Sequence, residues 1–241
     1  KLVECERRAA WNVQYGLPKE NYIEYETDSE AVKFHKYSQQ MLVGNENFAD
    51  EKNTMKFNDL TSTEDGITRE KLFKKYQELV LKLREYENLS IRKSEYNVGF
   101  TCIVDGVENK DGEVVDKKVA TIFMGRADLV GYADGIPIII ELKTRPEDVK
   151  DQLEAQLYAL GVSQLMKTEE IIVLHVYSLD DATLQKERRY SSSELLSMTE
   201  KFEDIAKKSG SWLPFDALNP KFSVGAWCEV CEFKNTCLEN R

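Results

Sequence analysis

Two carboxylates and a lysine lie close together in the stretch "GRADLVGYADGIPIIIELKT" (125–144): Asp128, Glu141 and Lys143. Like charges that face each other destabilise a sheet, and a divalent cation between them reverses that effect. Mg²⁺ prefers oxygen ligands, activates bound water and stabilises charge on a phosphate. A lysine ammonium beside the metal can steady an attacking hydroxide or a phosphoryl oxygen. These residue types predict metal-dependent hydrolysis of a phosphate ester.

A tight hairpin is expected to position the two carboxylates. Asp134-Gly135 favours a two-residue type I′ turn. Tyr132 then lies opposite Pro137 in a non-hydrogen-bonded pair, where the missing N–H of proline is harmless. In the same register Asp128 lies opposite Glu141, with Cβ atoms about 4.5–5.5 Å apart. The hairpin therefore predicts a paired-carboxylate site at its open end.

Strand side chains alternate, so the two faces of this hairpin differ in character. One face carries four charged residues: Arg126, Asp128, Glu141 and Lys143. The other face carries the residues expected in the core: Ala127, Leu129, Ile138, Ile140 and Leu142. An alternative is open at this point, in which the charged face is an ordinary surface with diagonal ion pairs, Asp128–Lys143 and Glu141–Arg126.

The order Asp, turn, Glu-x-Lys closely resembles the defining pattern of the PD-(D/E)XK nucleases, and Gly-Arg-x-Asp at 125–128 is similar to their RecB-type branch. The resemblance implies an α/β fold, with a PD-(D/E)XK restriction-endonuclease-like core and a small mixed sheet flanked by helices. It also implies that Asp128 and Glu141 hold Mg²⁺ or Mn²⁺ and that Lys143 assists catalysis. The family often has a histidine that completes the metal shell, which His35 matches, and imidazole suits Mn²⁺. The alternative for His35 is a solvent-facing helix position.

Three cysteines form a C-x2-C-x5-C run, Cys228, Cys231 and Cys237, and a closed site needs a fourth ligand, either Cys5 or Cys102. RecB-type nucleases with an iron–sulfur cluster have one Cys before the nuclease motifs and three near the C-terminus. Examples are the Cas-four family of CRISPR systems, AddB-type nuclease domains and eukaryotic exonuclease V. The resemblance implies that Cys5 and the run hold a [4Fe–4S] cluster, which staples the helical N-terminus to the C-terminal tail. A structural Zn site on the same thiolates is the alternative.

Several further residues are candidate substrate contacts. RecB-type nucleases usually show Gln-x-x-x-Tyr on the helix after the hairpin, whereas this helix reads "DQLEAQLYAL", with Tyr158 four residues after Glu154. Gln152 and Gln156 share a helix face, so either could reach the scissile strand. The candidate substrate-binding residues are therefore Arg126, Gln152, Gln156 and Tyr158. Glu95 matches a Ser-Glu often seen on the strand before the family's Asp, and its alternative is a strand-edge charge.

The pattern along the chain predicts one nuclease domain, 1–241, of mixed α/β order. Predicted helices cover 1–20, 29–42, 68–86, 146–160 and 191–210, and predicted strands cover 91–104, 118–132 and 171–179. Residues 43–66 are expected to be an irregular loop, and Asp105–Asp116 a turn-rich excursion. The domain comprises an N-terminal helical part with the first cluster Cys (1–42), a loop and helical insertion (43–90), the nuclease core (91–180), and a C-terminal helix with the cluster tail (181–241). Cys102 and His175 lie in predicted strands and are expected to be core residues.

Composition limits the class of protein and its location. The chain has 241 residues with 41% hydrophobic content, which is globular rather than disordered, and it has no apolar run of membrane-spanning length. The net charge of −10 argues against a general nucleic-acid coat but allows a nuclease with a local basic groove. Five cysteines, an odd count, do not fit a disulfide scaffold and favour a reducing compartment, the cytoplasm.

The sequence thus predicts a metal-dependent deoxyribonuclease. By resemblance, it cuts single-stranded DNA as an exonuclease directed to the 5′ end, in CRISPR spacer acquisition or DNA repair. CRISPR integration proteins or other repair proteins are the expected partners, and no association with a membrane is expected. Two alternatives stay open: a non-catalytic nucleic-acid-binding or assembly subunit, and the nuclease domain of a larger helicase–nuclease.

Overall fold

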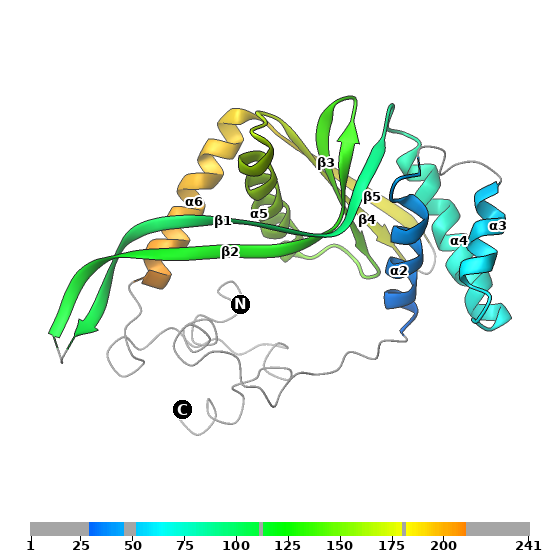
Figure 1. The fold of residues 1–241 in the computed structure, drawn as a ribbon, viewed down its shortest axis with the longest axis horizontal. Coiled ribbons are helices and arrows are strands. Elements are labelled where there is room, and N and C mark those ends of the chain that lie inside the picture. The colour runs from blue at the N-terminus through cyan, green and yellow to red at the C-terminus, as the bar shows by residue number, and fades with distance from the viewer. Residues whose placement is uncertain (1–28, 46–51, 111–112, 180–181, 211–241) are drawn as a thin grey trace, which may run out of the picture. The chain divides into compact units, whose positions relative to one another are not determined.

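The computed structural model describes residues 29–45, 52–110, 113–179 and 182–210 (Figure 1). The chain divides into two compact units. The first, here the core unit, comprises Glu26–Phe100 and Phe123–Thr199. The second, the arm unit, comprises Lys1–Tyr25, Thr101–Ile122 and Glu200–Arg241. The described residues of the predicted active site all belong to the core unit.

The described residues form helices on a mixed sheet. The helices are α2 (Glu30–Leu42), α3 (Lys52–Leu60), α4 (Gly66–Leu83), α5 (Val149–Met166) and α6 (Ser192–Gly210). The strands are β1 (Ser90–Lys110), β2 (Glu113–Ala133), β3 (Ile136–Lys143), β4 (Ile171–Ser178) and β5 (Thr183–Tyr190). They lie in the order β1-β2-β3-β4-β5, and β3 is antiparallel to β2 but parallel to β4. The helix α5 connects this parallel pair, as a parallel crossover requires.

The hairpin of β2 and β3 has the predicted register. Tyr132 pairs with Pro137, and Leu129 pairs with Ile140. Both residues of the turn Asp134-Gly135 have positive φ, 50° and 82°, as a type I′ turn requires. The backbone ladder ends at the Leu129–Ile140 pair, so the two carboxylates lie just beyond its last rung.

Capping residues determine where the helices begin. Ser29 accepts a hydrogen bond from a backbone N–H of the first turn of α2, which confirms the helix predicted over 29–42. Asp148 and Asp151 form a capping box at the start of α5. This helix therefore begins later than the predicted 146–160 segment, and it continues to Met166.

Some stretches predicted as irregular are regular structure. Residues 43–66 contain α3, whose Phe57 is buried and stacks on Tyr76 of α4 with 5.1 Å between ring centroids. One buried aromatic anchors this polar helix, so the sequence shows too little apolar periodicity to indicate it. Most of Asp105–Asp116 continues β1 and β2. The sequence also does not predict β5, because half of the residues of this edge strand are charged and it lacks an apolar run.

The sheet of the core unit is covered on both faces. One face packs into a core with α2, α3 and α4 that includes the hairpin residues Leu129, Ile138, Ile140 and Leu142, all buried as predicted. On the other face α5 lies against β3 and β4 (Figure 1). Strands covered on both faces are normally apolar throughout, so the charged residues in β3 and β4 call for an explanation.

The described part of the arm unit consists of the outer segments of β1 and β2 and the end of α6. Cys102 is a buried free thiol, as predicted, and Phe202 of α6 is buried as well. The four cysteines predicted to hold a cluster lie outside the described residues: Cys5, Cys228, Cys231 and Cys237. Among the described residues, no helix is both long and apolar enough to cross a membrane.

Candidate active site

The two carboxylates each bind the backbone of the opposite strand. The Asp128 N–H donates to Glu141 Oε1 (3.0 Å), and the Leu142 N–H donates to Asp128 Oδ2 (2.8 Å). The remaining oxygens face different partners. Asp128 Oδ1 lies 3.5 Å from His35 Nδ1, and Glu141 Oε2 lies 3.2 Å from Lys143 Nζ. The structure therefore brings together the four residues that the sequence predicts for catalysis and metal binding.

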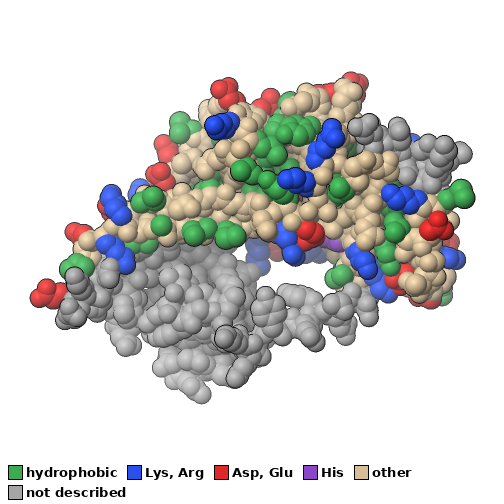
Figure 2. All heavy atoms as spheres, in the orientation of Figure 1, with side chains coloured by type: hydrophobic (Ala, Val, Ile, Leu, Met, Phe, Trp, Pro, Cys, Tyr) green, Lys and Arg blue, Asp and Glu red, His purple; other side chains and the backbone are tan. Residues whose placement is uncertain are grey.

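His35 and Asp128 line an open cavity of about 380 Å³ in the core unit. The other lining residues are Ala31, Val32, Lys36, Gln39, Glu95 and Arg126. Figure 2 shows basic, acidic and histidine side chains close together on one face of the molecule. Phe34, the neighbour of His35 on α2, is buried in the core and fixes the helix against the sheet. A cation or phosphate that enters the cavity thus meets an imidazole and a carboxylate held on rigid elements.

Glu141 is a carboxylate in an unfavourable environment, only 2% exposed. Burial, followed by the charge of Asp128, raises the pKa of Glu141 well above its usual range, although Lys143 partly offsets this. A divalent cation would relieve this conflict, because it pairs with both charges. Two carboxylates suit Mg²⁺, and an added imidazole suits Mn²⁺. The side chains present therefore fit the predicted metal.

Lys143 lies between two carboxylates. Its Nζ is 2.6 Å from Glu154 Oε2 and 3.2 Å from Glu141 Oε2, and its side chain is mostly buried. Burial lowers the pKa of Lys143, but the charges of Glu141 and Glu154 outweigh burial and raise that pKa overall. Lys143 is therefore a fixed ammonium at neutral pH, which rules it out as a general base in this state.

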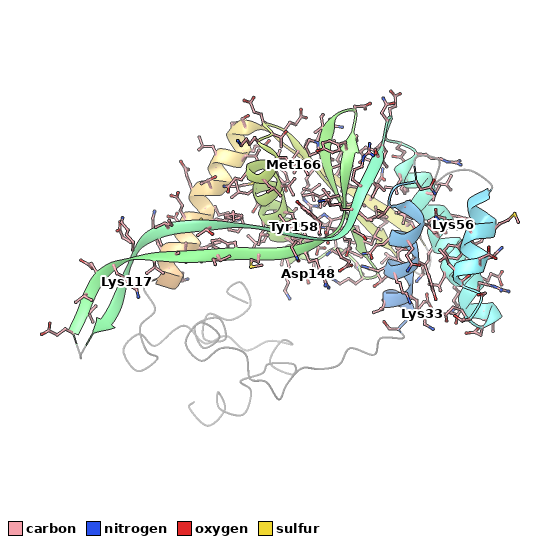
Figure 3. The ribbon with its side chains drawn as sticks, viewed as in Figure 1. Lys33, Lys56, Lys117, Asp148, Tyr158 and Met166 are labelled. Carbon is pink, nitrogen blue, oxygen red and sulfur yellow. The ribbon has the colours of Figure 1, made fainter. Side chains whose placement is uncertain are left out.

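The helix α5 presents Glu154 and Tyr158 to the site, four residues apart and so on one helix face. Tyr158 extends from α5 (Figure 3), and its hydroxyl donates to the Arg126 carbonyl at 3.1 Å. Gln152 and Gln156 lie about 200° around the helix from Glu154, since a helix turns once in 3.6 residues. Gln152 and Gln156 therefore lie on the opposite face of α5 from Glu154, and Glu154 has the spacing to Tyr158 that the Gln has in Gln-x-x-x-Tyr.

Gly125 allows Tyr158 to approach β2 closely. A Cβ at position 125 would lie 2.4 Å from Tyr158 Cε1, and Tyr158 is buried and cannot swing away. We expect Gly125→Ala to push Tyr158 and α5 off the sheet, lowering the free energy of unfolding by about 1–3 kcal/mol. The shift also displaces Glu154, and we expect nuclease activity to fall by about 100-fold.

Urea denaturation and a cleavage assay check this prediction. Gly66→Ala is the matched control, because a Cβ at position 66 meets nothing within 4 Å. Equal stability and activity of the two variants would show that Tyr158 does not need its contact with β2.

Arg126 belongs to a second cluster at the cavity. Its Nε lies 2.6 Å from Glu95 Oε2, and Glu95 Oε1 accepts a hydrogen bond from Gln39 Nε2 at 2.7 Å. Glu95 has a φ of 50°, a left-handed conformation that is uncommon for a strand residue and is typical of a local bulge. Arg126 therefore pairs with Glu95 rather than with Glu141, which contradicts the ordinary-surface alternative for the hairpin.

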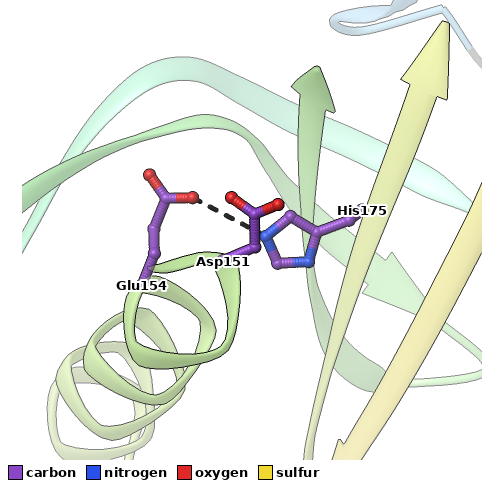
Figure 4. A group of neighbouring side chains, drawn as sticks. All are labelled: Asp151, Glu154 and His175. Atoms are coloured by element: carbon purple, nitrogen blue, oxygen red, sulfur yellow. Dashed lines mark ion pairs between the residues drawn. The ribbon is translucent and has the colours of Figure 1, made fainter. Parts of the chain in front are cut away.

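Another ionisable group lies on α5 and β4 (Figure 4). Asp151, Glu154 and His175 have potential ligand atoms within 4.8 Å of one another, so they form a candidate acidic and histidine metal site. Asp151, however, already accepts hydrogen bonds from three partners: Arg145 (3.1 Å), the Tyr177 hydroxyl (3.0 Å) and the Asp148 N–H (2.9 Å). Burial raises the pKa of Asp151, but these donors outweigh burial and lower that pKa to about 2.

Comparison with protein families places this site in a known class. A family model of the PD-(D/E)XK nuclease superfamily matches residues 1–238. The chain belongs to the PD-(D/E)XK nuclease superfamily. Membership implies metal-dependent nuclease activity, that is, hydrolysis of phosphodiester bonds with a divalent metal. The predicted α/β fold with a mixed sheet flanked by helices is confirmed for this PD-(D/E)XK protein.

Among solved structures, 17 chains match. One of them, described as "Crystal structure of SSO0001", is 18% identical and covers 100% of this chain and 84% of that chain. Its TM-score of 0.37 marks a distant likeness. No protein of curated function matches this PD-(D/E)XK chain.

The sequence interpretation missed two side chains of this PD-(D/E)XK site, Glu154 and His175. The spacing of Glu154 to Tyr158 was an available signal, because it repeats Gln-x-x-x-Tyr with a carboxylate in place of the amide. His175 is fully buried, as predicted, but it lies beside Glu141 in the parallel ladder of β3 and β4. No local pattern indicates this neighbour, since the pairing joins strands separated by a whole helix.

Proposed function

We propose that the chain hydrolyses single-stranded DNA as a 5′-directed exonuclease in a reducing, cytoplasmic compartment. The arrangement of Asp128 and Glu141 supports the hydrolytic activity in this proposal. One oxygen of each carboxylate accepts a backbone N–H of the opposite strand, and the other oxygen is turned away from these N–H groups. The preference for single strands and 5′ ends is supported by the sequence resemblance. The compartment is supported by the odd cysteine count.

The geometry supports the following metal-binding and catalytic roles. Asp128, Glu141 and His35 would hold Mg²⁺ or Mn²⁺, which supplies an activated water and neutralises phosphate charge when bound. Lys143, kept as an ammonium by Glu141 and Glu154, stabilises negative charge on the attacked phosphate.

Other residues position the DNA. Arg126 and Lys36 both line the cavity beside Asp128, where they can bind the phosphates that flank the scissile bond. Tyr158 has a different role from the predicted substrate contact. It is buried and binds the Arg126 carbonyl, so it fixes β2 next to Asp128 rather than reaching DNA.

A cleavage assay tests this function. With Mn²⁺ or Mg²⁺, we expect wild type to degrade 5′-labelled single-stranded DNA and to spare a circular single strand. Asp128→Asn removes a charged metal ligand and is expected to cut at least about 100-fold more slowly. Asp134→Asn, in the turn of the same hairpin, is the matched control and is expected to cut normally.

Two outcomes would redirect the proposal. Equal cutting by wild type and Asp128→Asn would place catalysis elsewhere. DNA binding without cutting by either protein would favour the non-catalytic assembly subunit, for which the resemblance points to CRISPR integration proteins or other repair proteins as partners.

We also propose a [4Fe–4S] cluster held by Cys5, Cys228, Cys231 and Cys237, supported by the C-x2-C-x5-C spacing and the resemblance to the Cas-four family. After anaerobic purification, wild type is expected to contain iron and acid-labile sulfide. Cys231→Ser is expected to lose both, whereas Cys102→Ser, at a buried free thiol, keeps them. Zinc without sulfide would identify a structural Zn site instead.

A further inference from the structure

Lys143 has a flexible four-carbon side chain, yet its ammonium is held from two sides. Glu141 belongs to the carboxylate pair and is expected to turn to the metal. Glu154 is the closer partner, at 2.6 Å, and comes from a separate element, α5. The position of Lys143 therefore depends on how firmly Glu154 is held.

A chain of contacts that runs through the buried ring of His175 holds Glu154. His175 Nε2 lies 3.6 Å from Glu154 Oε2 (Figure 4), an ion-pair distance that is longer than a hydrogen bond, and the ring is fully buried. On the other side of the ring, Arg188 Nη1 lies 3.0 Å from His175 Nδ1. A guanidinium can only donate, so Nδ1 accepts and Nε2 carries the ring proton toward Glu154. Arg188 is anchored in turn, because its Nη2 donates to Glu147 Oε1 at 2.9 Å.

These contacts favour a supporting role for the group over a cation site. A histidine nitrogen that carries a proton cannot bind a metal ion. Both oxygens of Asp151 are already engaged, by Arg145 and by Tyr177. Glu154 is thus the member of the group that faces the catalytic residues, and it already has a cationic partner in Lys143.

We propose that Glu154 is the positioning residue of Lys143, and that His175 and Arg188 fix Glu154. This inference rests on the proposed nuclease function, in which Lys143 faces the attacked phosphate. In the resembled family a glutamine usually occupies the position of Glu154, and its neutral amide could not pair with the charge of the Lys143 ammonium. The carboxylate of Glu154 can. Glu154 thereby gives Lys143 one defined location before DNA arrives.

The test uses Glu154→Gln, which keeps the shape of the side chain and removes its charge. We expect kcat to fall by about 10- to 100-fold, the usual effect of losing a partner behind a catalytic site. KM and the Mn²⁺ affinity measured by calorimetry are expected to stay close to wild type. Glu170→Gln, the same change at an exposed carboxylate, is the control and is expected to have no effect.

A second measurement needs neither metal nor DNA. In ¹⁵N NMR of metal-free wild type, hydrogen bonds are expected to make the Lys143 ammonium signal visible, and Lys143→Met identifies it by its loss. The signal is expected to disappear through fast proton exchange in Glu154→Gln and to weaken in His175→Gln.

The outcomes separate this inference from the proposed function. A retained ammonium signal with unchanged kcat in Glu154→Gln would overturn the positioning role. Loss of one bound Mn²⁺ in the same variant would also overturn it, because Glu154 would then be a metal ligand. Absence of cleavage by wild type would count against the nuclease function alone, since the ammonium signal still decides the role of Glu154.

Discussion

Replacing Glu141 with glutamine is expected to remove metal-dependent cleavage and, at the same time, to stabilise the metal-free protein at neutral pH. Glu141→Gln keeps an oxygen for the Asp128 N–H but removes a buried negative charge beside Asp128. The loss of a metal-binding charge is expected to slow cleavage by at least about 100-fold. Activity and stability thus change in opposite directions, which distinguishes a functional carboxylate from a structural one.

The pH dependence of stability has a definite sign at Glu141. Burial and then Asp128 raise the pKa of Glu141, so protonation of this residue favours the folded state. That contribution is complete below the ordinary pKa of 4.5 and is lost as pH rises through the raised pKa. Metal-free wild type is therefore expected to lose stability as pH rises toward neutrality, while Glu141→Gln shows little of this loss.

Urea denaturation with a chelator, repeated with Mn²⁺, measures both effects. Metal at 100 times its Kd is expected to stabilise wild type by about 2.7 kcal/mol and to leave Glu141→Gln nearly unchanged. Glu170→Gln, at an exposed carboxylate, is the control. A Glu141→Gln protein that is less stable than chelated wild type at every pH would contradict the prediction.

Asp151→Ala is expected to be destabilising, by about 1–3 kcal/mol, because it leaves the buried Tyr177 hydroxyl without its acceptor and the half-exposed Arg145 without its anion. The change removes the acceptor of Arg145, Tyr177 and the Asp148 N–H. Asp148→Ala is the matched control on the same helix, since it removes only the N-cap hydrogen bonds and is expected to cost about 1 kcal/mol.

The pH dependence at Asp151 has the opposite sign from that at Glu141. Arg145, the Asp148 N–H and Tyr177 outweigh burial and lower the pKa of Asp151 from 3.8 to about 2. This shift contributes about 2 kcal/mol of stability above the ordinary pKa, and the contribution is lost as pH falls toward 2. The stability difference between wild type and Asp151→Ala is thus expected to become smaller as pH is lowered from 7 to 3. A constant difference would contradict the assignment.

The sequence predicts the hairpin well because its signals are local. The turn Asp134-Gly135, the tolerated Pro137 and the alternation of charged and apolar residues all specify one register, which the structure confirms. The paired carboxylates follow directly from that register. The strand ladder, however, ends at Leu129–Ile140 and does not reach the predicted pair of Asp128 with Glu141, where side chains take over the contacts between the strands.

The orientation of α5 is the part that the sequence does not specify. Polar residues recur at every second position, Gln152, Glu154 and Gln156, so either face of the helix could be turned to the sheet. Packing decides which face of α5 is turned to the sheet. Gly125 on β2 leaves room for the ring of Tyr158, and this contact turns the face that carries Glu154 toward the sheet. Contacts between elements far apart in the chain, such as Glu154 with His175, follow only after that choice.

The strand β3 is hydrogen-bonded to β2 as far as Ile140 and to β4 as far as Lys143, and beyond Ile140 the Asp128 and Glu141 side chains continue the contacts with β2. In amide hydrogen exchange, central strands of this kind open only when the whole cooperative unit opens. Glu141 and Lys143 lie on this strand, so local fluctuations at helix ends or loops do not separate them. Heat inactivation is therefore expected to follow the same curve as the loss of sheet structure, without a folded but inactive intermediate.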